Sequence, residues 1–112
     1  MCRYLIEKGH CILERNWRTG HLEVDIISLD RDGIHFVEVK TRVAPILVEP
    51  EQNVRKDKQR KIAKAALLYM KSKDDRKGWD EMEIHLDVSA VVLEGGKETI
   101  RYFEDAYIPI YV

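Results

Sequence analysis

Two carboxylates and a lysine stand where the sequence otherwise indicates buried β-strands. The segment HFVEVKTR at 35–42 carries Glu38 and Lys40 within an apolar run, and Asp25 lies in the similar segment LEVDIISLD. A charge inside a sheet costs roughly several kcal/mol unless a partner compensates it. Two hard oxygen ligands suit Mg²⁺ or Mn²⁺, and a nearby lysine could orient or deprotonate a water that attacks a phosphodiester. The pattern therefore indicates metal-dependent hydrolysis.

These residues can meet only if their two strands pair in one register. The turn RDG at 31–33 predicts a hairpin, because its glycine can take the positive φ that such turns need. A hairpin centred on this turn places Asp25 opposite Glu38 and Glu23 opposite Lys40. Facing carboxylates repel, so a cation between them is expected. The other explanation is a salt bridge at the strand end, such as Glu23 with Lys40.

Strict alternation assigns these side chains to faces of the sheet. On the strand predicted at 34–42, the third in the chain, it places Ile34, Phe36, Glu38 and Lys40 on one face. On the strand predicted at 22–30, the second, it places Glu23, Asp25, Ile27 and Leu29 on one face. Both faces of the third strand are largely apolar, which is typical of a central strand that is covered on both sides.

Periodicity and turn residues predict seven elements in the order α-β-β-β-α-β-β. They are a helix that begins at 2 and stops at Gly9, strands at 11–18, 22–30 and 34–42, a helix at 53–72, and strands at 83–93 and 97–103. Pro45 and Pro50 predict a loop at 43–52, and Pro109 predicts an irregular or extended tail at 106–112. The predicted fold is α/β, a mixed sheet of about five strands flanked by helices, in a single domain at 1–112.

Positive charge is concentrated in one part of the chain. Residues 53–77 hold ten Lys or Arg and three Asp, a net charge of +7, whereas the rest holds nine basic and seventeen acidic residues, a net charge of −8. Arg55, Lys58 and Arg60 could contact the phosphates of a nucleic acid, and Lys58 and Gln59 would extend the inward stripe of the helix. The alternative is a solvated helix face that only aids solubility.

Other classes of protein are disfavoured by the composition. We expect no contact with a membrane, because no run of about 18 apolar residues is present, and the first residues lack the apolar core of a secretion signal. A cytoplasmic location is expected. Cys2 and Cys11 lack a metal-binding spacing and are expected to be free thiols.

Five segments occur in the order found in the YraN-like family of bacterial proteins: YLIEKGHCILERNWR, LEVDIISLD, FVEVKTR, KQRKIAKAALLYM and LDVSAVVL. The chain resembles this uncharacterised family, which is similar to the PD-(D/E)XK superfamily of restriction endonucleases and Holliday-junction resolvases. The resemblance implies a restriction-endonuclease-like core with Asp25, Glu38 and Lys40 at the three signature positions. The accessory positions that it implies are Glu23, Lys58 and Gln59.

The leading hypothesis is a metal-dependent, nuclease-like protein that acts on nucleic-acid phosphodiesters, DNA more than RNA. In this hypothesis Asp25, Glu38 and the Val39 carbonyl bind Mg²⁺ or Mn²⁺, and Lys40 serves the attacking water. A homodimer could address two strands. The alternative is a non-catalytic module that binds nucleic acid or another partner and keeps the nuclease fold, with the charges as structural pairs.

Overall fold

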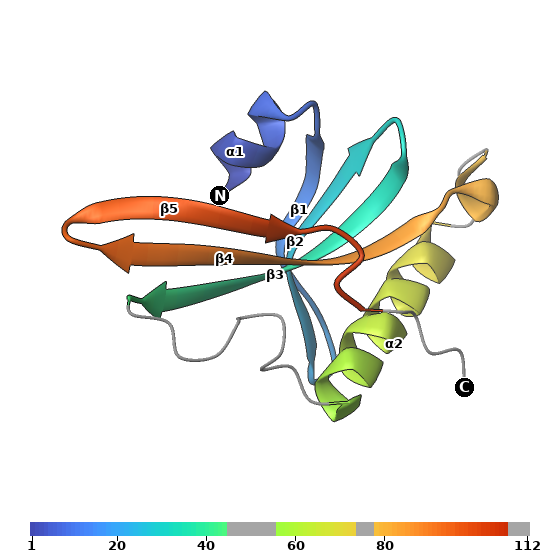
Figure 1. Cartoon of the computed structure of the whole chain (residues 1–112). Helices are drawn as coiled ribbons and strands as arrows, with labels where there is room; N and C mark the ends of the chain where they lie inside the picture. The colour runs from blue at the N-terminus through green and yellow to red at the C-terminus, as the bar shows by residue number, and fades with distance from the viewer. Residues whose placement is uncertain (45–55, 74–77, 108–112) are drawn as a thin grey trace.

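Five strands form one sheet within residues 1–44, 56–73 and 78–107, which are the residues that the structure, a computed structural model, describes. The strands lie in chain order: β1 (Cys11–Thr19), β2 (Leu22–Asp30), β3 (Gly33–Val43), β4 (Ile84–Glu94) and β5 (Lys97–Phe103). Strands β3 and β4 are parallel, and the other neighbours are antiparallel (Figure 1). This confirms the predicted α/β mixed sheet and its element order.

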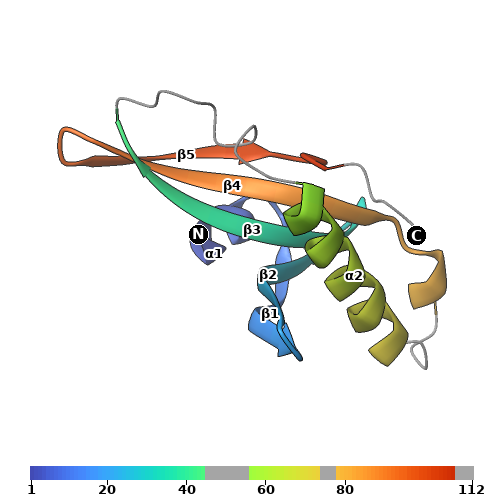
Figure 2. The same cartoon turned by 90° about the horizontal axis from the view of Figure 1, so that it is seen from below.

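Helices cover opposite faces of this sheet. Helix α1 (Cys2–Glu7) lies on one face and α2 (Lys56–Ser72) on the other (Figures 1 and 2). A 3₁₀ turn, η2 (Trp79–Glu81), was not predicted. The predicted helix start at Asn53, residues 45–52 of the predicted loop and residues 108–112 of the predicted tail lie outside the described residues. The prediction that the loop begins at Val43 is wrong, because Val43 still pairs with Leu93 as the last residue of β3. Neither α1 nor α2 is long and apolar enough to cross a membrane, and the other described residues hold no helix that is.

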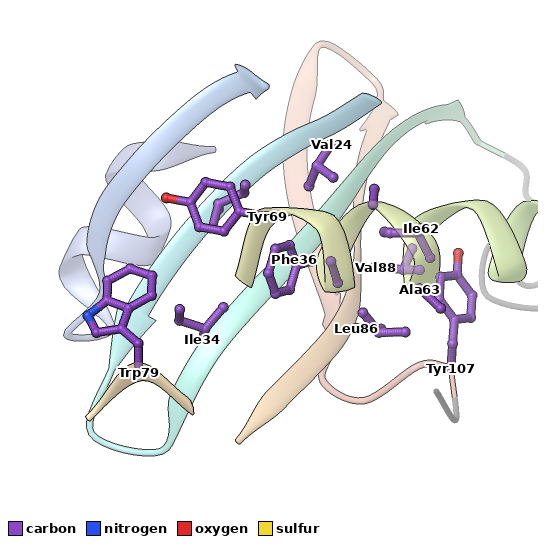
Figure 3. Packing of buried hydrophobic residues seen from close by; sticks show 13 residues of the cluster. Val24, Ile34, Phe36, Ile62, Ala63, Tyr69, Trp79, Leu86, Val88 and Tyr107 are labelled. Carbon is purple, nitrogen blue, oxygen red and sulfur yellow. The ribbon is translucent and has the colours of Figure 1, made fainter. Parts of the chain in front are cut away.

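The larger core lies between α2 and the sheet. Ile34 and Phe36 of β3 belong to it, whereas Val37 packs in a second cluster with residues of α1, as alternation predicts. Ile62 and Tyr69 supply the facing layer from α2 (Figure 3). Each such large apolar side chain contributes roughly 1.5–3 kcal/mol when it is buried, so this layer holds α2 against β3.

The predicted register of the β2–β3 hairpin is confirmed. Its ladder begins at Asp30 opposite Gly33 and continues to Ile26 opposite Val37. The same register carries the start of β2 toward the second half of β3, where Glu38 is located. The turn residues therefore determine which polar side chains of the two strands come near each other.

The prediction of strict alternation along the whole of β2 is wrong. Val24 packs in the same cluster as Ile27, although their positions differ by an odd number, and Ile26 packs on the face of α1. The physical reason is a local irregularity at Asp25. The β2–β3 ladder ends at Ile26, and Asn16, on the neighbouring stretch of β1, has a φ of 52°. At Asp25 the backbone of β2 is therefore no longer paired with β3, although it remains paired with β1.

Gly33→Ala should lower the free energy of unfolding by roughly 2–4 kcal/mol. Gly33 has a φ of 137°, and a Cβ there would lie 2.4 Å from the carbonyl oxygen of Glu83. That oxygen also accepts the N–H of Ile34, which ties the starts of β3 and β4 together. Denaturant unfolding measures the loss. Gly95→Ala is the control, because its φ is 53° and no atom lies within 4 Å, so it should cost only about 1–2 kcal/mol. Equal losses of stability in the two variants would contradict a clash between a Cβ at position 33 and the carbonyl oxygen of Glu83.

Candidate functional site

A pocket of about 210 Å³ opens where β2 begins, beside β3 and the first turns of α2. It brings together Asp25 and Glu38, which the sequence predicted as neighbours, with Lys58 of α2, which was predicted to point toward the sheet. The complete lining within the described residues is His21, Leu22, Glu23, Val24, Asp25, Glu38, Lys58, Lys61 and Ile62. Acidic side chains from the sheet and basic side chains from the helix thus face one space.

Asp25 is half-buried at the point where β2 leaves the β3 ladder. Its Oδ2 accepts the N–H of Val39 at 2.8 Å, so the carboxylate satisfies a backbone group that the ladder no longer pairs. Burial raises the pKa of Asp25 above its usual range; the N–H of Val39 opposes this, and the charges of Glu23 and Glu38 add to it. An additional cation beside Asp25 would favour its ionised form.

Glu38 is mostly buried and has a partner on each oxygen. Lys58 Nζ lies 2.7 Å from Oε1, and the hydroxyl of Tyr107 donates to Oε2 at 3.0 Å. Burial raises the pKa of the Tyr107 phenol, and the charge of Glu38 adds to this, so the hydroxyl stays protonated. The Lys58 side chain is 56% exposed, and such an ion pair contributes only about 0–1 kcal/mol. A ligand can therefore displace Lys58 at small cost.

Lys40 is buried beside this site and does not line the pocket that the described residues form. Burial lowers its pKa, and the negative charge of Glu38 opposes the decrease. A lysine with a lowered pKa exchanges its proton more readily near neutral pH than an exposed lysine does. The structure thus places Lys40 close enough to Glu38 for their charges to interact.

The other predicted residues are more scattered. Glu23 is exposed and lies 3.5 Å from Arg18. Val39 is half-buried and packs toward α1, Gln59 is half-buried on α2, and Arg60 is exposed on α2. Arg55 lies outside the described residues. Of the three basic residues predicted to contact nucleic acid, the structure therefore describes Lys58 and Arg60.

Two residues of the site were missed from the sequence. Lys61 lines the pocket together with Lys58 and Ile62, and their spacing of three and four residues on a helix is a signal that could have revealed it. Tyr107 follows β5, and its hydroxyl reaches Glu38 from a stretch that looked like an irregular tail. Nothing in the local sequence indicates that contact.

A second polar cluster, also missed, surrounds His35 near the start of β3. The Nδ1 of His35 lies 2.6 Å from Asp87, and its Nε2 lies 2.9 Å from Asp30. Burial lowers the pKa of His35, but the hydrogen bonds to the two carboxylates outweigh this effect and raise the pKa to about 9. In the chain without a ligand, His35 is therefore an imidazolium that donates to both carboxylates.

Two more imidazoles flank His35. The rings of His10 and His85 each have centroids 4.6 Å from that of His35. Two groups among the described residues bring three ligand atoms within 4.8 Å of one another, as a metal ion requires: His10 with Asp30 and His35, and His35 with His85 and Glu104. The histidines come from separate elements, so no spacing in the sequence indicates the cluster.

Comparison with known proteins gives one consistent family. Residues 1–91 match the uncharacterised protein family UPF0102. The similar proteins include a UPF0102 protein of Bacteroides thetaiotaomicron, 34% identical over 95% of this chain and 84% of that protein. Another, from Syntrophomonas wolfei, is 39% identical over 94% of this chain and 88% of that protein. Among solved structures, Pyrococcus furiosus SfsA in complex with Ca²⁺ has a TM-score of 0.41 and 17% identity, over 91% of this chain and 58% of that one.

Asp25→Asn should stabilise the protein in a chelating buffer at neutral pH. The amide oxygen can still accept the N–H of Val39, and the unfavourable charge is removed. Because the pKa of Asp25 is raised on folding, the folded chain holds this proton to a higher pH than the unfolded chain, and wild-type stability falls as pH rises through that window. The advantage of Asp25→Asn should therefore grow above pH 3.8, the ordinary value, and then level off.

Denaturant unfolding of both proteins across this pH range measures the difference. Glu98→Gln is the control, because Glu98 is exposed on β5 and does not line the pocket, so this substitution should change the free energy of unfolding by no more than about 0.5 kcal/mol. A loss of stability in Asp25→Asn at neutral pH, or a difference that does not change with pH, would contradict the described electrostatics.

Proposed function

We propose that this chain, which belongs to the uncharacterised protein family UPF0102, is a metal-dependent nuclease-like protein that acts on nucleic-acid phosphodiesters. Membership of the family confirms the resemblance to the YraN-like proteins. The relation of that family to the PD-(D/E)XK nucleases, and a preference for DNA, are part of the proposal. It is supported by the site itself.

The observation that carries the proposal is the convergence of Asp25 and Glu38 on one pocket that Lys58 and Lys61 also line. Two carboxylates can hold a hard cation, and two ammonium groups can hold a phosphate beside it. Burial, together with its acidic neighbours, disfavours the charged form of Asp25, and the partner of Glu38 on the helix is exposed and exchangeable. These are the properties that a site for both a cation and an anion needs.

The donor set fits Mg²⁺ or Mn²⁺. Asp25 and Glu38 would hold the ion with carboxylate oxygens, and the main-chain carbonyl of Val39 is the proposed third ligand. When bound, a divalent ion of this kind neutralises charge on the phosphate and activates water. Asp25 would stay aligned through the N–H of Val39, and Tyr107 would hold the other carboxylate in place.

The remaining side chains would position the substrate and carry protons. Lys58 and Lys61 would bind the phosphate at the start of α2, where the helix dipole also favours an anion. Lys40 Nζ, with its lowered pKa, would orient the attacking water or accept its proton. Glu23 and Gln59 are proposed as accessory residues at the rim. A homodimer would present two such sites to two strands.

One observation favours a second function. Both oxygens of Glu38 already have protein partners, Lys58 and Tyr107, so the carboxylate is satisfied without a metal ion. The same residues could serve a non-catalytic module that binds nucleic acid or another partner through α2. In that case Lys40 would chiefly neutralise nearby acids, and its removal would cost a few kcal/mol, roughly, of stability.

Lys40→Ala should lower metal-dependent cleavage by roughly 10²-fold or more while nucleic-acid binding changes little, because the amine acts mainly in the transition state. The measurement is kcat/KM on a panel of single-stranded, duplex and branched DNA and RNA with Mg²⁺ or Mn²⁺. Lys40→Met keeps most of the buried stem and tests the same role if the alanine variant fails to fold. Lys97→Met, on exposed β5, is the control and should keep full activity.

Two results together would overturn the nuclease in favour of the module. They are the absence of metal-dependent cleavage by the wild-type chain on every substrate and a strongly destabilised Lys40→Met. Added Mg²⁺ should raise the Tm of the wild-type chain by mass action and should not raise that of Asp25→Asn.

Neutralising Lys58 and Arg60 should flatten the dependence of nucleic-acid affinity on salt. Each lost phosphate contact lowers the slope of log K against log salt by about 0.9 for duplex DNA and about 0.7 for a single strand. Arg55 is proposed as a third contact. The measurement is binding between roughly 50 and 200 mM salt. The matched control neutralises two exposed positive charges away from α2, Arg31 in the β2–β3 turn and Lys97 at the start of β5. An unchanged slope in the α2 variant would place the interface elsewhere.

A further inference from the structure

Three possible metal ligands meet at the turn end of the sheet, on the face of α1. His10 stands just before β1, Asp30 ends β2, and His35 lies near the start of β3. The Nε2 of His35 is 2.9 Å from Asp30 Oδ1, and the Nε2 of His10 is 3.4 Å from Asp30 Oδ2. Two imidazoles thus present the same ring nitrogen to one carboxylate.

The other ring nitrogen of each imidazole, Nδ1, has a hydrogen-bond partner of its own. Nδ1 of His10 lies 2.8 Å from the hydroxyl of Ser28, and Nδ1 of His35 lies 2.6 Å from Asp87. Asp87 is itself fully buried and accepts the hydroxyl of Tyr102 at 2.5 Å. Partners of this kind fix the orientation of a histidine that coordinates a metal through its remaining nitrogen.

We propose that His10, Asp30 and His35 form a binding site for a first-row divalent transition-metal ion such as Zn²⁺. Two imidazole nitrogens and one carboxylate oxygen are the ligands that such ions prefer, whereas Mg²⁺ prefers oxygen alone. The site would join the starts of β1 and β3 to the end of β2. It does not depend on the proposed nuclease function.

The spacing of the ligand atoms is close to what a tetrahedral ion needs. Ligands at about 2.0–2.1 Å from Zn²⁺ lie about 3.3 Å apart. The separation between His10 Nε2 and Asp30 Oδ2 is already of this size, and the ligand atoms of all three residues lie within 4.8 Å of one another. Binding would require Nε2 of His35 to release its proton to solvent and to move away from Asp30 Oδ1 by a few tenths of an ångström. Asp30 is 15% exposed, whereas His35 is 1% exposed, so the fourth position would be reached from the solvent side of Asp30.

His85 lies against His35 but is not proposed as a ligand. Its Nδ1 is 2.8 Å from Asp105, and its Nε2 is 3.0 Å from the carbonyl oxygen of Asp32. Both ring nitrogens are therefore directed at other acceptors. Glu104, which completes the second possible group with His85, is exposed. His85 thus provides a control of the same residue type, next to the site and outside its ligand set.

The test is a titration of the full chain with Zn²⁺ alone, after removal of metal by a chelator. Cys2→Ser and Cys11→Ser are included in every protein, because Cys11 adjoins His10 and a thiol could bind the ion. Calorimetry gives stoichiometry and affinity, and the visible absorption of Co²⁺ reports tetrahedral coordination. The ligand variants are His10→Gln and Asp30→Asn, and Ser28→Ala tests the positioning of His10. Circular dichroism checks that each variant folds.

One ion per chain is expected, with affinity lowered at least about 10-fold in both ligand variants and about 10-fold in Ser28→Ala. His85→Gln and the distant His21→Gln should change it less than twofold, and excess Mg²⁺ should not compete. No binding, or undiminished binding in both ligand variants, would overturn the proposal and leave a metal-free hydrogen-bond network. Loss of Zn²⁺ binding in His21→Gln would place the ion in the pocket of Asp25 and Glu38, which His21 lines, and would also overturn the proposal.

Discussion

Strand β3 lies in the middle of the sheet with a helix over each face, so a charged side chain on its buried stretch, Gly33 to Lys40, needs a partner inside the molecule. Glu38 meets this need with a lysine from α2 and the hydroxyl of Tyr107. His35 meets it with carboxylates from β2 and β4. Segments far apart in the sequence are therefore brought to β3 by polar contacts as well as by apolar packing.

The two polar clusters on β3 differ in ways that follow from their surroundings. The Glu38 cluster borders a pocket, and the Lys58 that compensates it is exposed, so its contacts can be exchanged for those of a ligand. The His35 cluster is enclosed, and its hydrogen bonds continue through Asp87 to Tyr102. One cluster offers oxygen ligands beside ammonium groups, and the other offers imidazoles. A single buried strand thus supports two chemically different sites, one on each face.

Most of the fold could be predicted because its signals are local. Alternation, turn glycines and helical spacing predicted the seven elements and the β2–β3 register, and that register brings Asp25 toward Glu38. The rest depends on contacts between distant segments. The histidine cluster needs the parallel register that sets His35 beside His85, and no turn encodes it. The irregularity of β2 at Asp25 arises where its ladder with β3 ends, which the sequence of β2 alone does not indicate.

The parallel pairing of β3 with β4 also has a consequence for how the chain reaches this structure. Three of the four strand pairs join neighbours connected by short turns, whereas β3 pairs Ile34 with Ile84, fifty residues along the chain. Closing a flexible loop of that length costs roughly 3–4 kcal/mol of entropy before any contact forms. The meander β1–β2–β3 and the hairpin β4–β5 can therefore assemble early, and their docking, with α2 folded between them, should limit the folding rate.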